Sequence, residues 1–307
     1  MLTITNLNKT YGNGVKALSN ISLTIDAGLF GLLGPNGAGK SSLMRTLASL
    51  QGVDSGDINF AGVNVLEQPA ALRNQLGYLP QEFGVYPKIS AFNLLDHFAV
   101  LKGIIDKKDR QQQVNALLEQ TNLTDVKNKA VSDFSGGMKQ RFGIAQALLG
   151  DPKLIIVDEP TAGLDPEERN RFHQLLSQLG ENRVVILSTH IVEDVSELCP
   201  KMAVLAAGKI LLQGKPSELI NQLKGKVWQR VIDVEQEKIF RENFKVISIR
   251  LSEGKRCIHI LADSQPEAEF KMVEPDLEDV YFATLYQQHD QQNADNANNA
   301  INAISVK

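Results

Sequence analysis

One short segment constrains the fold more than any other part of the sequence. It fits the pattern G-x-x-x-x-G-K-[ST] and lies between an apolar run, Phe30–Leu33, and a helical pattern, Ser42–Leu50. Its residues are Gly34, Pro35, Asn36, Gly37, Ala38, Gly39, Lys40 and Ser41. In such a loop the glycines let backbone amides approach phosphate oxygens, and the following helix adds partial positive charge at its start. The segment therefore predicts a P-loop, with Lys40 at the β- and γ-phosphates of a nucleotide and Ser41 bound to Mg²⁺.

A second acidic segment supports this prediction. The apolar run Leu154–Val157 leads directly into Asp158 and Glu159. Because ligands of open α/β sheets bind at the carboxyl ends of the strands, both carboxylates are expected near the phosphates. Asp158 suits Mg²⁺ through water, and Glu159 suits the water that attacks the γ-phosphate. Taken alone, such a pair more often begins a loop or caps a helix, but the upstream P-loop favours the functional interpretation.

The order of apolar and amphipathic runs predicts an α/β fold with a mostly parallel sheet covered by helices. Two short alternating runs near the start, Leu2–Leu7 and Ile21–Ile25, indicate edge strands of an antiparallel β subdomain. About residues 88–150 are mostly helical in pattern. A further helix is expected over Pro166–Leu179, with Asp165 as its N-cap.

The chain of 307 residues leaves room for a small domain after the cassette of about residues 1–224. Residues 225–286 contain three strand-like runs and one helical pattern, which predict a small α+β appendage: Lys226–Glu235, Lys245–Leu251, Arg256–Ala262 and Pro275–Leu285. Residues 287–307 are rich in Asn, Gln and Ala, and we expect them to be disordered because they offer little apolar surface to bury.

Composition excludes several classes of protein. The formal net charge of −4 provides no basic field for nucleic acid, so no nucleic-acid partner is expected. The longest apolar runs are far shorter than the roughly 20 residues that a membrane-spanning helix needs, so a partner would have to hold the chain at a membrane. Cys199 and Cys257 lie far apart in the sequence, and we expect two buried, reduced thiols.

With these motifs in place, about residues 1–224 resemble the nucleotide-binding domain of the ATP-binding cassette (ABC) family. The resemblance implies that the loop from Gly34 to Ser42 binds ATP and that hydrolysis uses Lys40, Glu159, Mg²⁺ and a switch histidine, His190. It further implies an adenine-stacking aromatic, a Q-loop glutamine that serves catalysis and Mg²⁺, a signature motif and a D-loop aspartate. These match Tyr11, Gln81, Ser135, Gly136, Gly137 and Asp165.

The signature segment also has a physical interpretation. Ser135 can cap a helix, and a capped, exposed helix end attracts anions. In the family this helix end closes over ATP held by a second nucleotide-binding domain, which implies a homodimer or heterodimer. The sequence departs from the family pattern at Phe134 and Met138, where Leu and Gln are usual. Because the serine and both glycines remain, we expect activity to survive.

Within the family, the loop Gly34–Ser42, together with the appendage and the segment Glu274–Tyr281, is most similar to the ATPases of ABC-2 exporters of the drug and antibiotic-resistance type. The resemblance implies an ATP-hydrolysing subunit, cytoplasmic and peripheral on the inner face of the cell membrane, that works with a separate multi-span permease. The segment from Glu82 to Pro87 is where the family docks the permease; buried packing of its aromatics is an equally good interpretation.

Other members of the superfamily fit less well. About 90 residues between P-loop and signature carry no sustained heptads, which disfavours a genome-maintenance ATPase with a coiled coil. A single cassette disfavours a translation factor, and Asn128-Lys129 lacks the aspartate of a GTPase base-reading motif. The alternative that stays open is an ABC-type regulator that binds nucleotide without driving transport.

Overall fold

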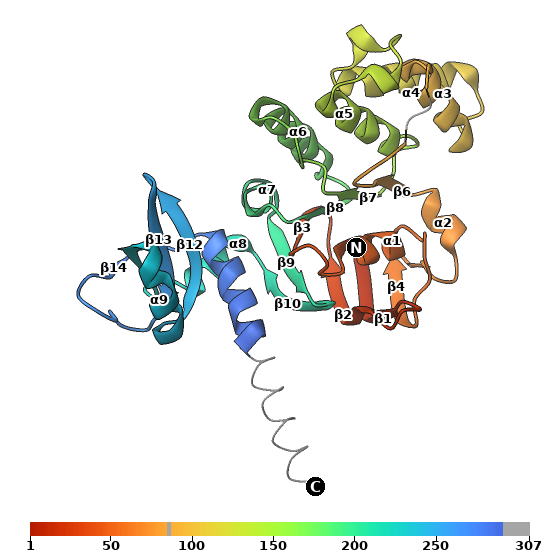
Figure 1. The fold of residues 1–307 in the computed structure, drawn as a ribbon. Helices are drawn as coiled ribbons and strands as arrows, with labels where there is room; N and C mark the ends of the chain where they lie inside the picture. The colour runs from red at the N-terminus through yellow and green to blue at the C-terminus, as the bar shows by residue number, and fades with distance from the viewer. Residues whose placement is uncertain (85–86, 291–307) are drawn as a thin grey trace. The chain divides into compact units, whose positions relative to one another are not determined.

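The computed structural model describes residues 1–84 and 87–290 and divides into two compact units. Unit 1 is Met1–Ile210 and unit 2 is Leu211–Lys307. The division falls upstream of residue 224, where the sequence pattern places the end of the cassette. Strand β10 (Lys209–Gly214) runs across the division. Each unit is described separately below (Figure 1).

The centre of unit 1 is a parallel sheet. Its strands follow the spatial order β9-β3-β8-β7-β6, so β3 is inserted between β8 and β9, whereas β6, β7 and β8 are neighbours in both the chain and the sheet. The strands are β3 (Gly28–Leu33), β6 (Leu76–Leu79), β7 (Leu154–Asp158), β8 (Val184–Thr189) and β9 (Lys201–Ala206). Every residue of β7 and β8 is buried, as expected for strands covered on both faces. The predicted parallel α/β sheet is therefore confirmed.

Outside the helical region of about residues 88–150, the described helices between these strands in the chain are α1 (Lys40–Leu47), α2 (Pro69–Arg73), α6 (Pro166–Leu179) and α7 (Val192–Leu198). Helix α6 begins as predicted, because the Asp165 carboxylate accepts a hydrogen bond of 2.8 Å from the backbone amide of Glu168. Its apolar residues point inward at helical spacing, and Phe172 and Leu176 are buried.

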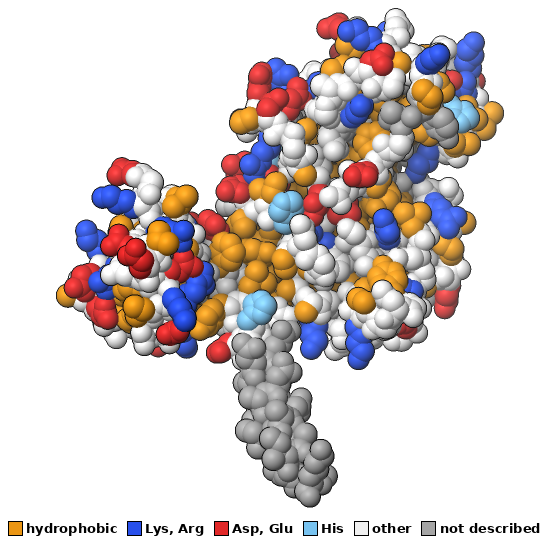
Figure 2. Space-filling model, viewed as in Figure 1, with side chains coloured by type: hydrophobic (Ala, Val, Ile, Leu, Met, Phe, Trp, Pro, Cys, Tyr) orange, Lys and Arg blue, Asp and Glu red, His pale blue; other side chains and the backbone are white. Residues whose placement is uncertain are grey.

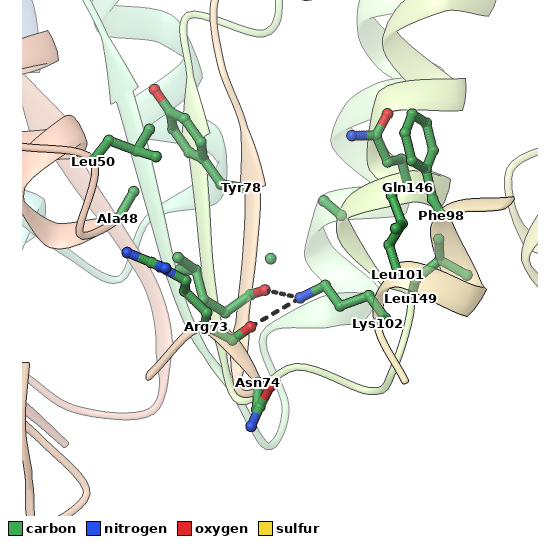
Figure 3. A pocket seen from close by; sticks show the side chains of 13 residues that line it. Ala48, Leu50, Arg73, Asn74, Tyr78, Phe98, Leu101, Lys102, Gln146 and Leu149 are labelled. Atoms are coloured by element: carbon green, nitrogen blue, oxygen red, sulfur yellow. Dashed lines mark hydrogen bonds between the residues drawn. The ribbon is translucent and has the colours of Figure 1, made fainter. Parts of the chain in front are cut away.

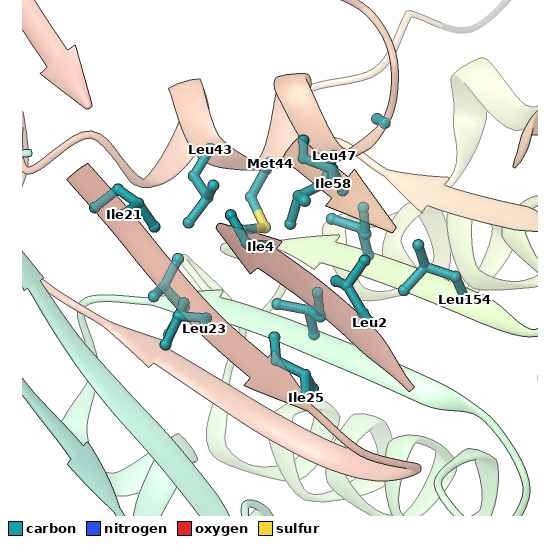
Figure 4. Close-up of a cluster of buried hydrophobic side chains, with 14 of the residues drawn as sticks. Leu2, Ile4, Ile21, Leu23, Ile25, Leu43, Met44, Leu47, Ile58 and Leu154 are labelled. Carbon is teal, nitrogen blue, oxygen red and sulfur yellow. The ribbon is translucent and has the colours of Figure 1, made fainter. Parts of the chain in front are cut away.

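An antiparallel sheet of order β2-β1-β4-β5 forms the N-terminal β part of unit 1. It consists of β1 (Leu2–Thr10), β2 (Lys16–Ile25), β4 (Ser55–Phe60) and β5 (Val63–Asn64). Figure 4 shows Leu43 and Met44 of α1 packed against Ile4 of this sheet, in one continuous core. Strand β1 lies between β2 and β4, so the prediction that β1 is an edge strand was wrong. Strand β4, the second partner of β1, was not predicted because its sequence is largely polar.

The region of about residues 88–150 is helical, as the sequence predicted. It contains α3 (Ala91–Leu101), α4 (Lys107–Gln120), α5 (Gly136–Ala147) and two short 3₁₀ turns, Thr124–Val126 and Val131–Asp133. Polar side chains cap all three helices, at Ser90, Asp106 and Ser135. Phe134, one of the departures from the family pattern, is buried and meets the ring of Phe142 edge-on at 6.3 Å.

Unit 2 contains a second antiparallel sheet, of order β12-β13-β11-β14, with helices beside it. Its elements are α8 (Pro216–Gln222), β11 (Val227–Ile232), a 3₁₀ turn (Val234–Gln236), α9 (Glu237–Asn243), β12 (Val246–Ser252), β13 (Lys255–Leu261) and β14 (Lys271–Met272). Trp228, Phe240 and Phe270 lie in its core. The predicted α+β composition is confirmed, although α9 was not predicted.

The predicted C-terminal helix is longer than expected, since residues 277–290 are helical. The first residues of the predicted tail, 287–290, belong to this helix, and the others, 291–307, lie outside the described residues. Acidic and basic side chains are interspersed on the face shown in Figure 2. None of the helices in the described parts of the chain is long and apolar enough to span a membrane.

Candidate functional site

The predicted phosphate loop joins β3 to α1 at the carboxyl end of the parallel sheet. Gly37 and Gly39 have φ angles of 78° and 107°, in the left-handed region that favours glycine. A Cβ atom on Gly39 would lie 2.4 Å from the carbonyl oxygen of Ala17, so glycine is also required by space. The loop therefore presents its backbone, followed at once by the N-terminus of α1, which is the arrangement that binds phosphate.

Lys40, the first residue of α1, is buried and turns back over the loop. Its ammonium donates hydrogen bonds to the carbonyl oxygens of Gly34 (2.8 Å) and Pro35 (3.2 Å). It also lies 3.3 Å from Oε1 of Glu159. The positive charge is thus held at the mouth of the loop, where phosphate oxygens would meet it.

Glu159 is the point at which the predicted catalytic side chains converge. Gln81 donates a hydrogen bond from Nε2 to its Oε2 at 3.2 Å, and Nδ1 of His190 lies 3.3 Å from the same oxygen. With Lys40 on Oε1, three predicted site residues surround one carboxylate that is only 8% exposed. Glu159 also has a φ of 48°, which is strained for a residue with a Cβ and is typical of functional positions.

Asp158 provides a test of whether Mg²⁺ fits this site. Its carboxylate is buried, and Oδ1 accepts no hydrogen bond from any described residue. Burial raises the pKa of Asp158, while the hydroxyls of Ser188 and Ser41 and the charge of Lys40 act in the opposite direction. A buried oxygen without a partner, beside a hydroxyl that can bind a metal, is the donor set that Mg²⁺ requires. The residues present therefore fit the ion.

A cavity of about 520 Å³ lies over the phosphate loop, within the size range of ligand sites. Predicted nucleotide-binding and catalytic residues line it: Tyr11, Pro35, Asn36, Gly37, Ala38, Gly39, Lys40, Ser41, Ser42, Gln81 and Glu159. Tyr11 is partly exposed, and its hydroxyl shares a hydrogen bond of 2.9 Å with the Ser42 hydroxyl. The phenol ring therefore borders the cavity, where a base could stack on it.

The signature and D-loop residues lie elsewhere in unit 1. Among the described residues that line the cavity, Ser135, Gly136, Gly137 and Asp165 do not occur. Ser135 caps α5 by accepting a hydrogen bond of 3.3 Å from the amide of Met138, and it is exposed, as is Gly136. The helix tip predicted to touch phosphate thus faces solvent rather than the chain's own phosphate loop.

Sequence reasoning missed part of the cavity wall. Val15, Lys16, Ala17, Ala207 and Gly208 also line it. The pair Ala207-Gly208 was recognised only as a turn, and both residues do have positive φ angles. In the fold, the amide of Gly208 donates a hydrogen bond of 2.9 Å to the carbonyl of Ala38, so this turn braces the phosphate loop. A turn's local sequence gives no signal for such a distant contact.

Comparisons with known proteins agree with this geometry. A family model described as "ABC transporter" matches residues 18–162. The "Probable multidrug ABC transporter ATP-binding protein YbhF" of Escherichia coli (strain K12) is 32% identical over 302 residues, covering 93% of this chain and 52% of that protein. The chain therefore spans about half the length of this relative. The "Nod factor export ATP-binding protein I" of Rhizobium etli is 36% identical over 228 residues, covering 73% of this chain and 71% of that protein.

Among solved structures, a similar one is titled "Dimeric structure of a post-hydrolysis state of the ATP-binding cassette MJ0796 bound to ADP and Pi". It is 25% identical in sequence, has a TM-score of 0.64, and covers 70% of this chain and 98% of that one. The likeness extends across the P-loop fold described above. From the phosphate loop, the convergent carboxylate and these matches together, the chain belongs to the ABC transporter family, as one of its ATP-binding cassettes.

Proposed function

We propose that the chain hydrolyses ATP as the motor subunit of an ABC exporter. One observation carries the proposal: Glu159, beside the phosphate cavity, is contacted by Lys40, Gln81 and His190 at 3.2–3.3 Å. A carboxylate held among these groups can accept the proton of a water that attacks the γ-phosphate. A module that only bound nucleotide would not need this convergence.

The roles of the other residues follow from their places around the cavity. Lys40 and the loop amides stabilise the charge that develops on the γ-phosphate. Asp158 and Ser41, with Gln81, are the residues that would hold Mg²⁺, which when bound supplies positive charge to the β- and γ-phosphate oxygens. His190 lies beside Glu159 and can hold the γ-phosphate or exchange a proton there. Tyr11 borders the cavity and is the candidate surface for adenine.

The proposed motor is a pair of cassettes. Ser135 and Gly136 form an exposed capped helix end outside the chain's own phosphate cavity. Gly137 follows in the same helix beside the side chain of Glu168, whose backbone amide donates to Asp165. A second copy, or a related cassette, would place this helix end over the γ-phosphate, so that each site uses two chains. The dimeric MJ0796 cassette supports this arrangement.

Export is the direction we propose. Two relatives are named for Nod factor export and for linearmycin resistance. A third is named "Probable multidrug ABC transporter ATP-binding protein YbhF". The partner would be a separate multi-span membrane subunit, and the chain would lie at the inner face of the cell membrane. The cargo would be chosen by that subunit, since no described element of this chain spans a membrane.

A second cavity in unit 1, of about 360 Å³, is our candidate for the contact with this subunit. It lies beside β6 and α3 and is mostly apolar, with Leu101 exposed at 71% (Figure 3). Of the described residues that line it, the charged ones are the cations Arg73 and Lys102. An occupant with an apolar helical face and an acidic side chain would complement it. Glu82 and Phe83 begin the adjoining segment proposed for the same contact; Val85 and Tyr86 lie outside the described residues.

Two experiments test the function. Steady-state ATP hydrolysis by the purified chain, abolished in Glu159→Gln, would support a motor; binding without hydrolysis would favour the nucleotide-binding regulator instead. Copurification of a multi-span protein from detergent-solubilised membranes tests the partner. Leu101→Asp should abolish that copurification and leave basal hydrolysis intact. Ile105→Asp, a change at an exposed apolar residue outside the cavity lining, should leave both copurification and hydrolysis unchanged.

Residues 225–286 are proposed as a regulatory or dimer-contact module following a cassette of residues 1–224. The proposal rests on the position of this segment after a complete set of cassette motifs. Val231 on β11 and Leu251 on β12 are exposed apolar residues of unit 2. If Val231→Lys and Leu251→Lys both leave dimerisation, ATPase rate and copurification unchanged, the surface that these residues form is not the contact.

A further inference from the structure

A buried carboxylate on α7, which the proposed hydrolysis does not use, contacts two of the segments that carry site residues. Asp194 is 0% exposed. Its Oδ2 accepts hydrogen bonds from the hydroxyls of Thr161 (2.5 Å) and Thr189 (3.3 Å). Its Oδ1 accepts one from Nε of Arg169 (2.8 Å) and lies 2.9 Å from Nε2 of His173. Four side chains from three separate parts of unit 1 therefore meet on one carboxylate.

The two threonines flank the catalytic residues in the sequence. Thr161 follows Glu159 and Pro160 directly, in the segment that leads to Asp165, and Thr189 immediately precedes His190. The Thr189 hydroxyl also accepts a hydrogen bond of 3.0 Å from the amide of Ile191. The Thr189 hydroxyl thus links the backbone on the far side of His190 to the carboxylate of Asp194, to which it donates its own hydrogen bond. His190 itself is exposed, and within residues 1–84 and 87–290 the one side-chain partner of its ring is Glu159.

The other two partners come from α6. Arg169 and His173 lie one helical turn apart and both face Asp194, so they fix α6 against α7. Because Asp165 caps α6, the position of the D-loop residue follows that of the helix. A buried charge is costly unless it is paired and hydrogen-bonded, and here the guanidinium of Arg169 pairs it. The carboxylate is therefore a rigid junction rather than a surface charge.

We propose that Asp194 is a positioning residue for ATP hydrolysis, holding His190 and the Thr161–Asp165 segment in fixed relation to Glu159. The proposal rests on the proposed ATPase function. It predicts a loss in kcat with little change in ATP affinity, since Asp194 does not line the phosphate cavity and its side-chain partners among the described residues are Thr161, Arg169, His173 and Thr189. Misplacement of a catalytic group by about 1 Å can lower a rate about 100-fold.

The test uses Asp194→Asn in the full chain, because asparagine keeps the shape but loses the charge and one acceptor. We expect kcat to fall about 100-fold and the Kd for ATP to stay within about 3-fold of the wild-type value. Glu193→Gln is the matched control. It removes one negative charge from the adjacent residue of α7, an exposed carboxylate whose Oε2 lies 3.9 Å from the same Arg169. We expect wild-type kcat from this control.

Two further variants keep the test decisive if Asp194→Asn does not fold. Thr189→Val and Thr161→Val keep the side-chain volume and each remove one hydroxyl. We expect either change to lower kcat while ATP affinity is retained, with the larger effect at Thr189, next to His190. Wild-type kcat in both threonine variants, or in a folded Asp194→Asn, would overturn the proposal.

A readout without hydrolysis separates this proposal from the proposed function. In the wild-type chain, the imidazole NMR signal of His190 should shift when Glu159→Gln changes its neighbour. In Asp194→Asn that response should be lost, because the histidine no longer sits beside residue 159. An equal response in both backgrounds overturns the positioning role, whether or not the chain hydrolyses ATP. If Asp194→Asn loses the His190 shift but the wild-type chain does not hydrolyse ATP, the positioning role of Asp194 is supported and only the proposed ATPase function is refuted.

Discussion

The ammonium of Lys40 lies 3.3 Å from the carboxylate of Glu159, so the residue proposed to stabilise the γ-phosphate and the residue proposed to activate water are paired with each other. Both side chains are almost fully buried. ATP must therefore compete with Glu159 for the charge of Lys40. Substitutions of these two residues should therefore change ATP affinity in opposite directions: loss of the Lys40 charge should weaken binding, and loss of the Glu159 charge should leave it unchanged or strengthen it.

Glu159→Gln should lower kcat about 10²–10⁴-fold, the range expected for loss of a general base. ATP affinity should be unchanged or higher, since the variant removes a negative charge that faces the phosphates. Steady-state kinetics and nucleotide titration measure the two effects. Glu181→Gln changes an exposed carboxylate between α6 and β8 and should behave as wild type. Near wild-type turnover in Glu159→Gln would rule out its role as the base.

Lys40→Ala should weaken ATP binding about 10–100-fold, which corresponds to the loss of about 1.5–3 kcal/mol from a charge-assisted contact with phosphate. Equilibrium titration with a fluorescent ATP analogue measures the change. Lys153→Ala serves as the control, because this lysine is exposed at the opposite end of β7 and pairs with Asp151. Equal affinity of Lys40→Ala and wild type would refute the phosphate contact.

Asp158→Asn should stabilise the chain while abolishing Mg²⁺-dependent hydrolysis. Burial raises the pKa of Asp158 above its ordinary value of 3.8, so the folded state binds a proton more tightly than the unfolded chain. Stability is therefore lost as the pH rises from that ordinary value through the raised one. Removing the unpartnered carboxylate should recover about 1–3 kcal/mol at neutral pH. Thermal unfolding with and without Mg²⁺ measures this, and the ion should raise the melting temperature of the wild type only.

Asp151→Asn is the control of opposite sign for that experiment. Hydrogen bonds from Arg183 and Lys153 lower the pKa of Asp151, so its contribution is present above the ordinary pKa and is lost on acidification. The side chain is more than half exposed, so the effect should be small. A variant Asp158→Asn that melted below the wild type at neutral pH would contradict the interpretation that the buried charge of Asp158 destabilises the fold without Mg²⁺.

Asp279→Asn should destabilise unit 2. Asp279 is 0% exposed, accepts a hydrogen bond of 2.7 Å from Arg250, and lies 2.8 Å from Nδ1 of His259. Removing a buried carboxylate that accepts these hydrogen bonds should cost about 1–3 kcal/mol, because Arg250 is partly exposed and keeps Asp276 and Glu278 as partners. Trp228, the only tryptophan of the chain, is buried in unit 2, so its fluorescence reports unfolding there. Glu278→Gln, a more exposed neighbour of the same arginine, should leave the transition near that of the wild type.

Much of the fold could be predicted because its signals are local. The apolar run before Gly34, the capped start of α6 at Asp165 and the Ala207-Gly208 turn each depend on a few adjacent residues. Strand β4 and helix α9 escaped prediction because their local patterns are polar and are stabilised by packing against distant residues such as Leu2 and Trp228. Tertiary context decided those elements.

The candidate site divides in the same way. The phosphate loop and the pair Asp158-Glu159 are contiguous motifs, whereas the contacts of Glu159 with Gln81 and His190 join residues far apart in the sequence. Resemblance to a family suggested the roles of Lys40, Gln81 and His190, but it did not predict that all three side chains would contact the carboxylate of Glu159. Asp194 carried no signal at all, since an acidic residue in a helix is ordinary until its four partners are known.

The exposed tip at Ser135 and the phosphate loop at Lys40 belong to one chain but to different halves of each proposed composite site. A mutant lacking a working tip and a mutant lacking a working loop would each be inactive alone. When the two mutants are mixed, one site of each mixed pair combines both defective elements. The other site combines the intact phosphate loop of the first mutant with the intact helix tip of the second. Two dead proteins would then restore part of the turnover that neither possesses.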